Sequence, residues 1–255
     1  MLLRKPVLEY YLRLTLRAML WILLISVGAT FLLGIGVLGT VNIGVATTEN
    51  TVFTGMEPTF FIAMLIICMS DFKPEFHFMF QHGVSRRSTF VAFVCNVVAA
   101  SAFFSATLYL ATIVFSIAGG WFGLQADASL IHALYGPRLE VMGTLSTIAL
   151  TLLFYWTMFI MAGVIGYFFA ILFYKLSKFG KIILGGAAVV AATALPVINN
   201  LTGGRIWQFA VWLGQTFVGR GALPNPFNGI AVFAALSAIV LLPCWLMIRR
   251  CKLQK

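Results

Sequence analysis

Long apolar runs separated by short polar segments constrain the fold of this 255-residue chain more than any other feature of its sequence. Hydrophobic residues make up 61% of the chain and charged residues only 9%, whereas a soluble domain carries about 25% charged residues. A helix needs about 20 apolar residues to cross a bilayer, so the chain has room for roughly six crossings with modest loops. The sequence therefore predicts an all-α integral membrane protein with a single transmembrane domain, 1–255.

Six apolar runs are the expected transmembrane helices, and they lie at about 18–41, 57–71, 88–118, 141–174, 182–199 and 227–248. Residues 1–18 place charged residues on one helical face and leucines on another, which is typical of an interfacial amphipathic helix. Glycine, aspartate and proline residues within 119–137 indicate a loop. The outer loop 200–226 contains an aromatic stretch, 205–219, that is too short to cross, so we expect an interfacial or re-entrant helix there.

The distribution of basic residues predicts the orientation in the membrane. The chain has 17 Lys and Arg against 7 Asp and Glu, a formal net charge of +10. If the N-terminus is cytoplasmic, all of the 17 except Arg138, Arg205 and Arg220 fall in cytoplasmic segments, where Lys and Arg accumulate in membrane proteins. We therefore expect a multi-pass protein of the plasma membrane with both termini in the cytoplasm. The positive charge is explained by this topology, and no nucleic-acid partner is expected.

No motif in the chain predicts catalysis or cofactor binding. Residues 34–39 match GxGxxG, but they lie inside an apolar run, where glycines favour close helix packing over nucleotide binding. Gly180 and Lys181 lack the upstream glycine of a Walker A loop, so we expect no ATP site and no other cofactor in this chain. His77 and His82 diverge by about 140° around a helix, so they predict no metal site. The sequence therefore favours a protein that is not an enzyme.

The polar residues inside the expected crossings are almost all neutral. Ionisable residues are nearly missing from the middle of these runs, which argues against proton-coupled or ion-coupled transport. Hydrogen bonding between helices is the favoured role of the neutral residues, and lining of a translocation path is the alternative. The candidates for that path are Asn96, Ser101, Thr107, Thr147, Thr151 and Tyr155.

The segment 72–87, expected in the cytoplasm, combines an aromatic stripe with helix-boundary residues. Phe72, Phe76 and Phe80 recur every four residues and share one helical face. Pro74 and Gly83 stand in the order of a first-turn proline and a C-terminal glycine, which predicts a short helix between them. Such an aromatic cytoplasmic helix favours docking in a protein groove. An interfacial aromatic belt with cytoplasmic arginines is the alternative.

The sequence Phe-Gln-His-Gly-Val-Ser-Arg-Arg-Ser-Thr-Phe at 80–90, between the second and third expected crossings, resembles the GVSRR loop of bacterial ABC transporter permease subunits of the export type. The order of the expected helices along nearly the whole chain is also similar to these permeases. The resemblance implies a homodimer or heterodimer of permeases with two separate cytoplasmic ATPases that bind ATP and Mg²⁺. It also implies that 74–82 is the coupling helix in the ATPase groove and that 6–18 is the connecting helix beside it.

The coupling residues that follow from the loop and the resemblance are Phe72, Lys73, Pro74, Glu75, Phe76, His77, Phe80, Gln81, Gly83, Arg86 and Arg87. Together they predict a permease subunit of an ATP-driven exporter for an amphipathic or hydrophobic cargo, such as an antimicrobial peptide, a toxin or a drug-like lipid. Two alternatives stay open. One is an intramembrane enzyme or processing protease, and the other is a peptide-immunity membrane protein without transport.

Overall fold

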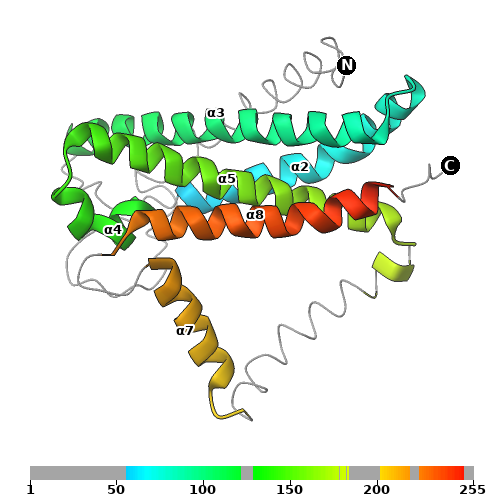
Figure 1. The fold of residues 1–255 in the computed structure, drawn as a ribbon. Coiled ribbons are helices and arrows are strands. Elements are labelled where there is room, and N and C mark those ends of the chain that lie inside the picture. Colours follow the sequence, from blue (N-terminus) through cyan, green and yellow to red (C-terminus); the bar gives the residue numbers. More distant parts are fainter. Residues whose placement is uncertain are drawn as a thin grey trace.

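The computed structural model describes residues 56–121, 129–177, 179–181, 183, 202–218 and 224–249. Within these ranges every regular element is an α-helix, which confirms the expected helical fold class for this part of the chain. The helices are α2 (Met56–Gln81), α3 (Arg86–Trp121), α4 (Leu130–Glu140), α5 (Thr144–Lys175), α7 (Arg205–Val218) and α8 (Pro226–Arg249), shown in Figure 1. The expected interfacial helix 1–18, the first crossing 18–41 and nearly all of the fifth crossing 182–199 lie outside the described residues.

Helix α5 lies at the centre of the described bundle and packs against α2, α3 and α8 (Figure 1). Glycines allow the closest of these contacts. A Cβ atom on Gly166 would lie 2.4 Å from the carbonyl oxygen of Leu65 in α2, and one on Gly163 would lie 2.9 Å from side-chain atoms of Met64 and Val97. These distances are shorter than van der Waals contact, so the approach of α2 to α5 requires the absence of a side chain at Gly166.

Three of the described helices are long and apolar enough to cross a bilayer: Arg86–Val114 within α3, α5 as a whole, and α8. With the mean hydropathy of +1.00 for the chain, these helices indicate a membrane protein. Helix α2 is not among the three, since acidic and basic residues interrupt its apolar run at both ends.

Helices α2, α5 and α8 run in the same direction, and α3 runs in the opposite direction (Figure 1). The short turn between α2 and α3 lies at the end of the bundle where α8 ends, because the Arg86 guanidinium donates to the carbonyl oxygen of Arg249 over 2.5 Å. We call this the turn end, and the opposite end the α4 end. Among the described residues, the basic ones on the helix parts near the turn end are Lys73, Arg86, Arg87, Lys175 and Arg249, whereas Arg138 lies on α4.

The segment between α3 and α5 differs from the expected loop 119–137. Helix α3 continues to Trp121, and α4 includes both Gly136 and Pro137. The reason is a stripe of apolar residues at helical spacing, because Ile131, Tyr135 and Leu139 are all buried in the core. Burial of this face outweighs the low helix propensity of glycine and proline.

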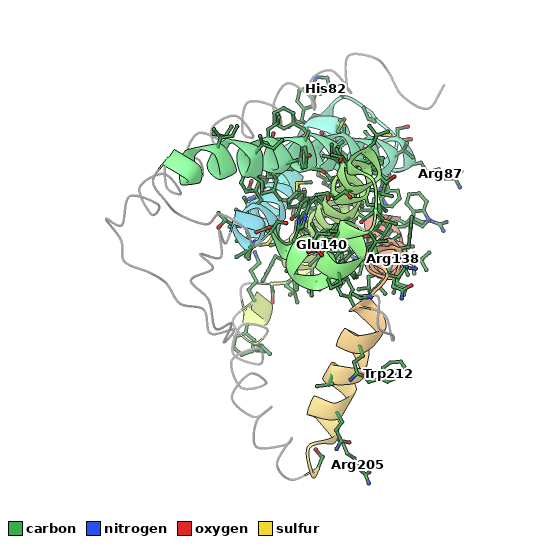
Figure 2. The ribbon with its side chains drawn as sticks, turned by 90° about the vertical axis from the view of Figure 1, so that its left-hand side faces the viewer. His82, Arg87, Arg138, Glu140, Arg205 and Trp212 are labelled. Atoms are coloured by element: carbon green, nitrogen blue, oxygen red, sulfur yellow. The ribbon has the colours of Figure 1, made fainter. Side chains whose placement is uncertain are left out.

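Helix α7 confirms that a helix forms within the aromatic stretch 205–219. Figure 2 views the bundle from the α4 end and shows Arg205 and Trp212 on α7, which projects away from the other helices. The end of α7 contacts α8, and Trp212 is 47% exposed.

Candidate functional site

The turn that joins α2 to α3 is closed at both sides by capping interactions. Gly83 has a left-handed φ of 66°, its amide donates to Phe80, and the amide of Val84 donates to Met79 over 3.0 Å. This pair of bonds is a Schellman motif, and Val84 packs against the small cluster formed by Met79 and Ala92. Ser85 then caps α3, because its hydroxyl accepts a hydrogen bond from the amide of Ser88.

The helix boundary expected at Pro74 is not observed, because α2 is continuous from Met56 to Gln81 with Pro74 inside it. The physical reason is that the aromatic stripe packs within the protein. Phe72 contacts the rings of Tyr167 and Tyr174 on α5 at centroid distances of 5.1 and 5.7 Å, and Phe76 contacts Tyr174 at 5.7 Å. These contacts keep α2 helical across the proline, so the expected coupling helix 74–82 is, up to Gln81, the last part of a long helix.

Burial divides the expected coupling residues into two groups. The buried members, whose side chains do not reach the surface, are Phe72, Glu75 and Phe76. The exposed members are Lys73, Pro74, Phe80, Gln81, Gly83 and Arg87, and the partly exposed members are His77 and Arg86. Figure 2 shows His82 and Arg87 at the edge of the bundle, pointing away from it. A surface that another protein can touch at this turn therefore centres on 80–87.

The partly exposed members make contacts within the bundle. His77 Nε2 lies 3.4 Å from the Tyr174 hydroxyl, and Arg86 contacts the last turn of α8. Next to Arg86, Phe90 packs on Trp245 at a centroid distance of 5.1 Å, and Arg249 stacks over the same indole. These contacts join the start of α3 to the end of α8, so the turn is fixed to two helices besides α2.

A second candidate site is a cavity of about 90 Å³ near the α4 end, between α3, α4 and α5. Seven of its eight lining residues are polar, and the eighth is Ile148. The polar residues are Tyr109, Thr112, Ser129, His132, Thr147, Thr151 and Tyr155. Three residues of the expected translocation path, Thr147, Thr151 and Tyr155, therefore meet at one cavity. We call it the hydroxyl cavity.

A buried carboxylate lies behind the wall of the hydroxyl cavity. Glu57, in the first turn of α2, is only 2% exposed. Its Oε1 accepts hydrogen bonds from the Tyr155 hydroxyl over 3.1 Å and from the Leu130 amide over 2.9 Å. Its Oε2 has no hydrogen-bond partner among the described residues. Glu57 thus joins the starts of α2 and α4 to α5.

Helix α4 supplies the other side of this network. Ser129 precedes α4, and its hydroxyl lies 2.8 Å from Nδ1 of the exposed His132. Tyr135 is buried deeper, and its hydroxyl donates to the carbonyl oxygen of Phe217 over 2.9 Å. Burial raises the pKa of Tyr135 to about 12, so this hydroxyl remains a donor at neutral pH. Tyr135 therefore fixes α4 to the end of α7.

The other three residues expected on the path lie away from the hydroxyl cavity. Asn96 is buried beside a much smaller cavity of about 10 Å³, which Asp71 and Glu75 also line. Ser101 is buried and donates to the carbonyl oxygen of Val97 within its own helix. Thr107 is buried in α3 as well. The six candidates therefore do not form one continuous polar path in this arrangement.

Sequence reasoning missed the acidic residues of the interior. Glu57 is the first residue of the expected crossing 57–71 and Glu75 follows its end, where a carboxylate is expected to meet water, yet both are at most 5% exposed. The prediction concerned only the middle of the runs, so it did not anticipate buried carboxylates at the ends of this one. The sequence did contain a signal for these buried carboxylates. Each one stands at the end of an apolar run, on a helix that packs against other helices. His132 joins the cavity because α4, which the sequence did not predict, turns it toward α5.

Comparisons with protein families, with curated proteins and with solved structures found no match for this chain.

Proposed function

We propose that this chain is a membrane-spanning permease subunit of an ATP-driven exporter of the ABC type. In this proposal the chain crosses the plasma membrane six times with both termini in the cytoplasm, and it pairs with a second permease. A separate ATPase subunit docks on the turn end and supplies the energy. The cargo is amphipathic or hydrophobic.

The observation that carries the proposal is the continuity of α2. One helix of 26 residues, about 39 Å long, connects the exposed turn at 80–87 with Glu57 beside the hydroxyl cavity. A force applied to the turn therefore reaches the opposite end of the bundle through a single rigid element. Packing of Phe72 and Phe76 against α5 transmits the same movement sideways.

The chemistry of the turn end supports docking of a protein. Phe80 is 39% exposed, and Gln81 and Arg87 are exposed in the same segment, 80–87. Aromatic residues and arginine contribute most of the binding energy in many protein interfaces. The clustering of basic residues at this end is the pattern expected of a cytoplasmic face. For ATP to drive transport, the nucleotide-bound ATPase must bind one arrangement of the permease more tightly than the other.

The direct test is association with a candidate ATPase subunit produced in the same cells. The tagged permease is purified from membranes that contain both subunits, and the amount of ATPase retained is measured. We expect the double substitution F80A/R87A to reduce the retained ATPase at least tenfold. The matched control is F227A/R205A, which removes an exposed phenylalanine and an exposed arginine far from the turn. Equal retention by both variants would contradict docking at the turn end.

A further inference from the structure

The three threonines of the hydroxyl cavity are placed as hydrogen-bond acceptors. A hydroxyl group has one proton to donate and two lone pairs that accept. The protons of these threonines are directed away to backbone carbonyl oxygens. Thr112 donates to the carbonyl oxygen of Leu108 over 2.9 Å, and Thr151 donates to that of Thr147 over 2.8 Å. Thr147 donates to the carbonyl oxygens of Leu139 and Gly143.

Tyr155 is fully engaged within the protein. Its proton points to Glu57 at 3.1 Å, and its oxygen also interacts with the Ser129 side chain and the Ile131 backbone. The acceptors that remain for a ligand are therefore the oxygens of the three threonines. A ligand that suits them is a donor of several hydrogen bonds.

The charge of Glu57 points to a cation. Its carboxylate is 2% exposed and forms no ion pair with a described Lys or Arg, and Oε2 has no hydrogen-bond partner among the described residues. A buried carboxylate without a counter-charge is costly in a medium of low dielectric constant. A cation in the hydroxyl cavity would lie one hydrogen bond away from it, behind Tyr155.

We propose that the hydroxyl cavity binds a primary ammonium group, the cationic head of an amphipathic amine. An ammonium nitrogen has three protons to donate and accepts none, which matches the acceptor oxygens of Thr112, Thr147 and Thr151. The volume of about 90 Å³ exceeds what one water molecule needs, so the head group fits. Ile148 also lines the cavity and offers an apolar contact for the alkyl part.

The identification of the bound ammonium compound as the transported cargo rests on the proposed function, whereas its binding to the hydroxyl cavity does not. The cavity belongs to one chain, so its test needs neither ATP nor the ATPase. Loss of ATPase association with intact ammonium binding would contradict only the exporter. Absence of ammonium binding with intact ATPase association would contradict only this inference.

The test uses the full chain in lipid nanodiscs and the probe n-hexylammonium. Binding is measured by calorimetry and by the rise of the thermal midpoint with ligand concentration. Two comparison ligands separate the contributions, since 1-hexanol has the same alkyl chain without the charge and sodium ion has the charge without the chain. We expect saturable binding of n-hexylammonium and none of the two comparison ligands at the same concentrations.

Three variants locate the bound ammonium. We expect Thr151→Val to weaken n-hexylammonium binding at least fivefold and Glu57→Gln at least tenfold. The matched control is Thr157→Val, since Thr157 also lies on α5 and donates to the carbonyl oxygen of Leu153 but does not line the cavity. It should leave the affinity unchanged. If Glu57→Gln fails to fold, Thr151→Val decides the result, because valine has nearly the same shape as threonine.

Several results would overturn the inference. If 1-hexanol stabilises the chain as much as n-hexylammonium does, the site is apolar. If sodium ion does so, the site binds an inorganic cation. If the Thr151 and Thr157 variants lose the same affinity for n-hexylammonium, the ligand does not bind in the hydroxyl cavity. Absence of n-hexylammonium binding would overturn it as well.

Discussion

The hydroxyl of Tyr155 donates a hydrogen bond to Oε1 of Glu57 over 3.1 Å, and this bond connects α5 to the first turn of α2 inside the bundle. Both residues are at most 2% exposed. The same carboxylate oxygen accepts the amide of Leu130 at the start of α4, so three helices meet at one oxygen atom. The stability of the α4 end therefore depends on a polar contact within an otherwise apolar core.

Replacing Tyr155 with phenylalanine removes this bond and leaves the ring in place. We expect the free energy of unfolding to fall by about 1–3 kcal/mol, because the buried Glu57 loses a donor that nothing else replaces. Denaturant unfolding of the purified chain in detergent measures the loss. Tyr109→Phe is the control, since Tyr109 lines the same cavity but does not bond to Glu57, and the substitution should change stability by less than about 0.5 kcal/mol. A similar loss in both variants would contradict a special role for the Glu57 contact.

Gly166→Ala tests the close approach of α5 to α2. The added Cβ would lie 2.4 Å from the carbonyl oxygen of Leu65, and a backbone atom of a packed helix cannot move away without separating the helices. We expect a loss of about 1–3 kcal/mol in unfolding free energy, as in other overpacked cores.

The control for that substitution is Gly136→Ala in α4, where the added Cβ meets no atom within 4 Å. There alanine favours the helix, so stability should stay the same or rise by up to about 1 kcal/mol. Destabilisation of both variants by the same amount would show that the cost at Gly166 does not come from Leu65.

The aromatic stripe of α2 separates into a core part and a surface part. Phe76 is 3% exposed, so Phe76→Ala should cost about 3–5 kcal/mol of stability by opening a cavity against Tyr174. Phe80 is 39% exposed, so Phe80→Ala should cost less than about 1.5 kcal/mol while it weakens association with the ATPase. Thermal unfolding and ATPase retention, measured on the same preparations, distinguish the two effects. Equal destabilisation would mean that the stripe is core along its whole length.

Sequence reasoning locates the long helices well, because each rests on a continuous apolar run. The expected crossings 88–118, 141–174 and 227–248 correspond to α3, α5 and α8 within a few residues, apart from the last three residues of α3. Gly83 and Ser85 end and begin helices through local bonds that a pattern of residues can predict. Such local features need no knowledge of the partner helix.

Features that depend on tertiary packing are not visible in the sequence. Pro74 is a reasonable helix start by local rules, yet α2 continues across it because Phe72 and Phe76 pack on α5. The helix around Gly136 and Pro137 forms for the same reason. The hydroxyl cavity combines α3, α4 and α5, so three of its residues could be suggested as polar candidates, but their meeting with Ser129 and His132 could not.

The central claim, that a separate ATPase docks on the turn end, is tested most directly by site-specific crosslinking in cells. A photoreactive residue is placed at Gln81, which is exposed at the turn, or at Gln215, which is exposed on α7. After illumination, the products are identified with antibodies to a candidate ATPase subunit produced in the same cells. The account predicts a crosslinked permease–ATPase product from position 81 and none from position 215. A product from position 215 alone, or none from position 81 with both subunits present in the membrane, would contradict it.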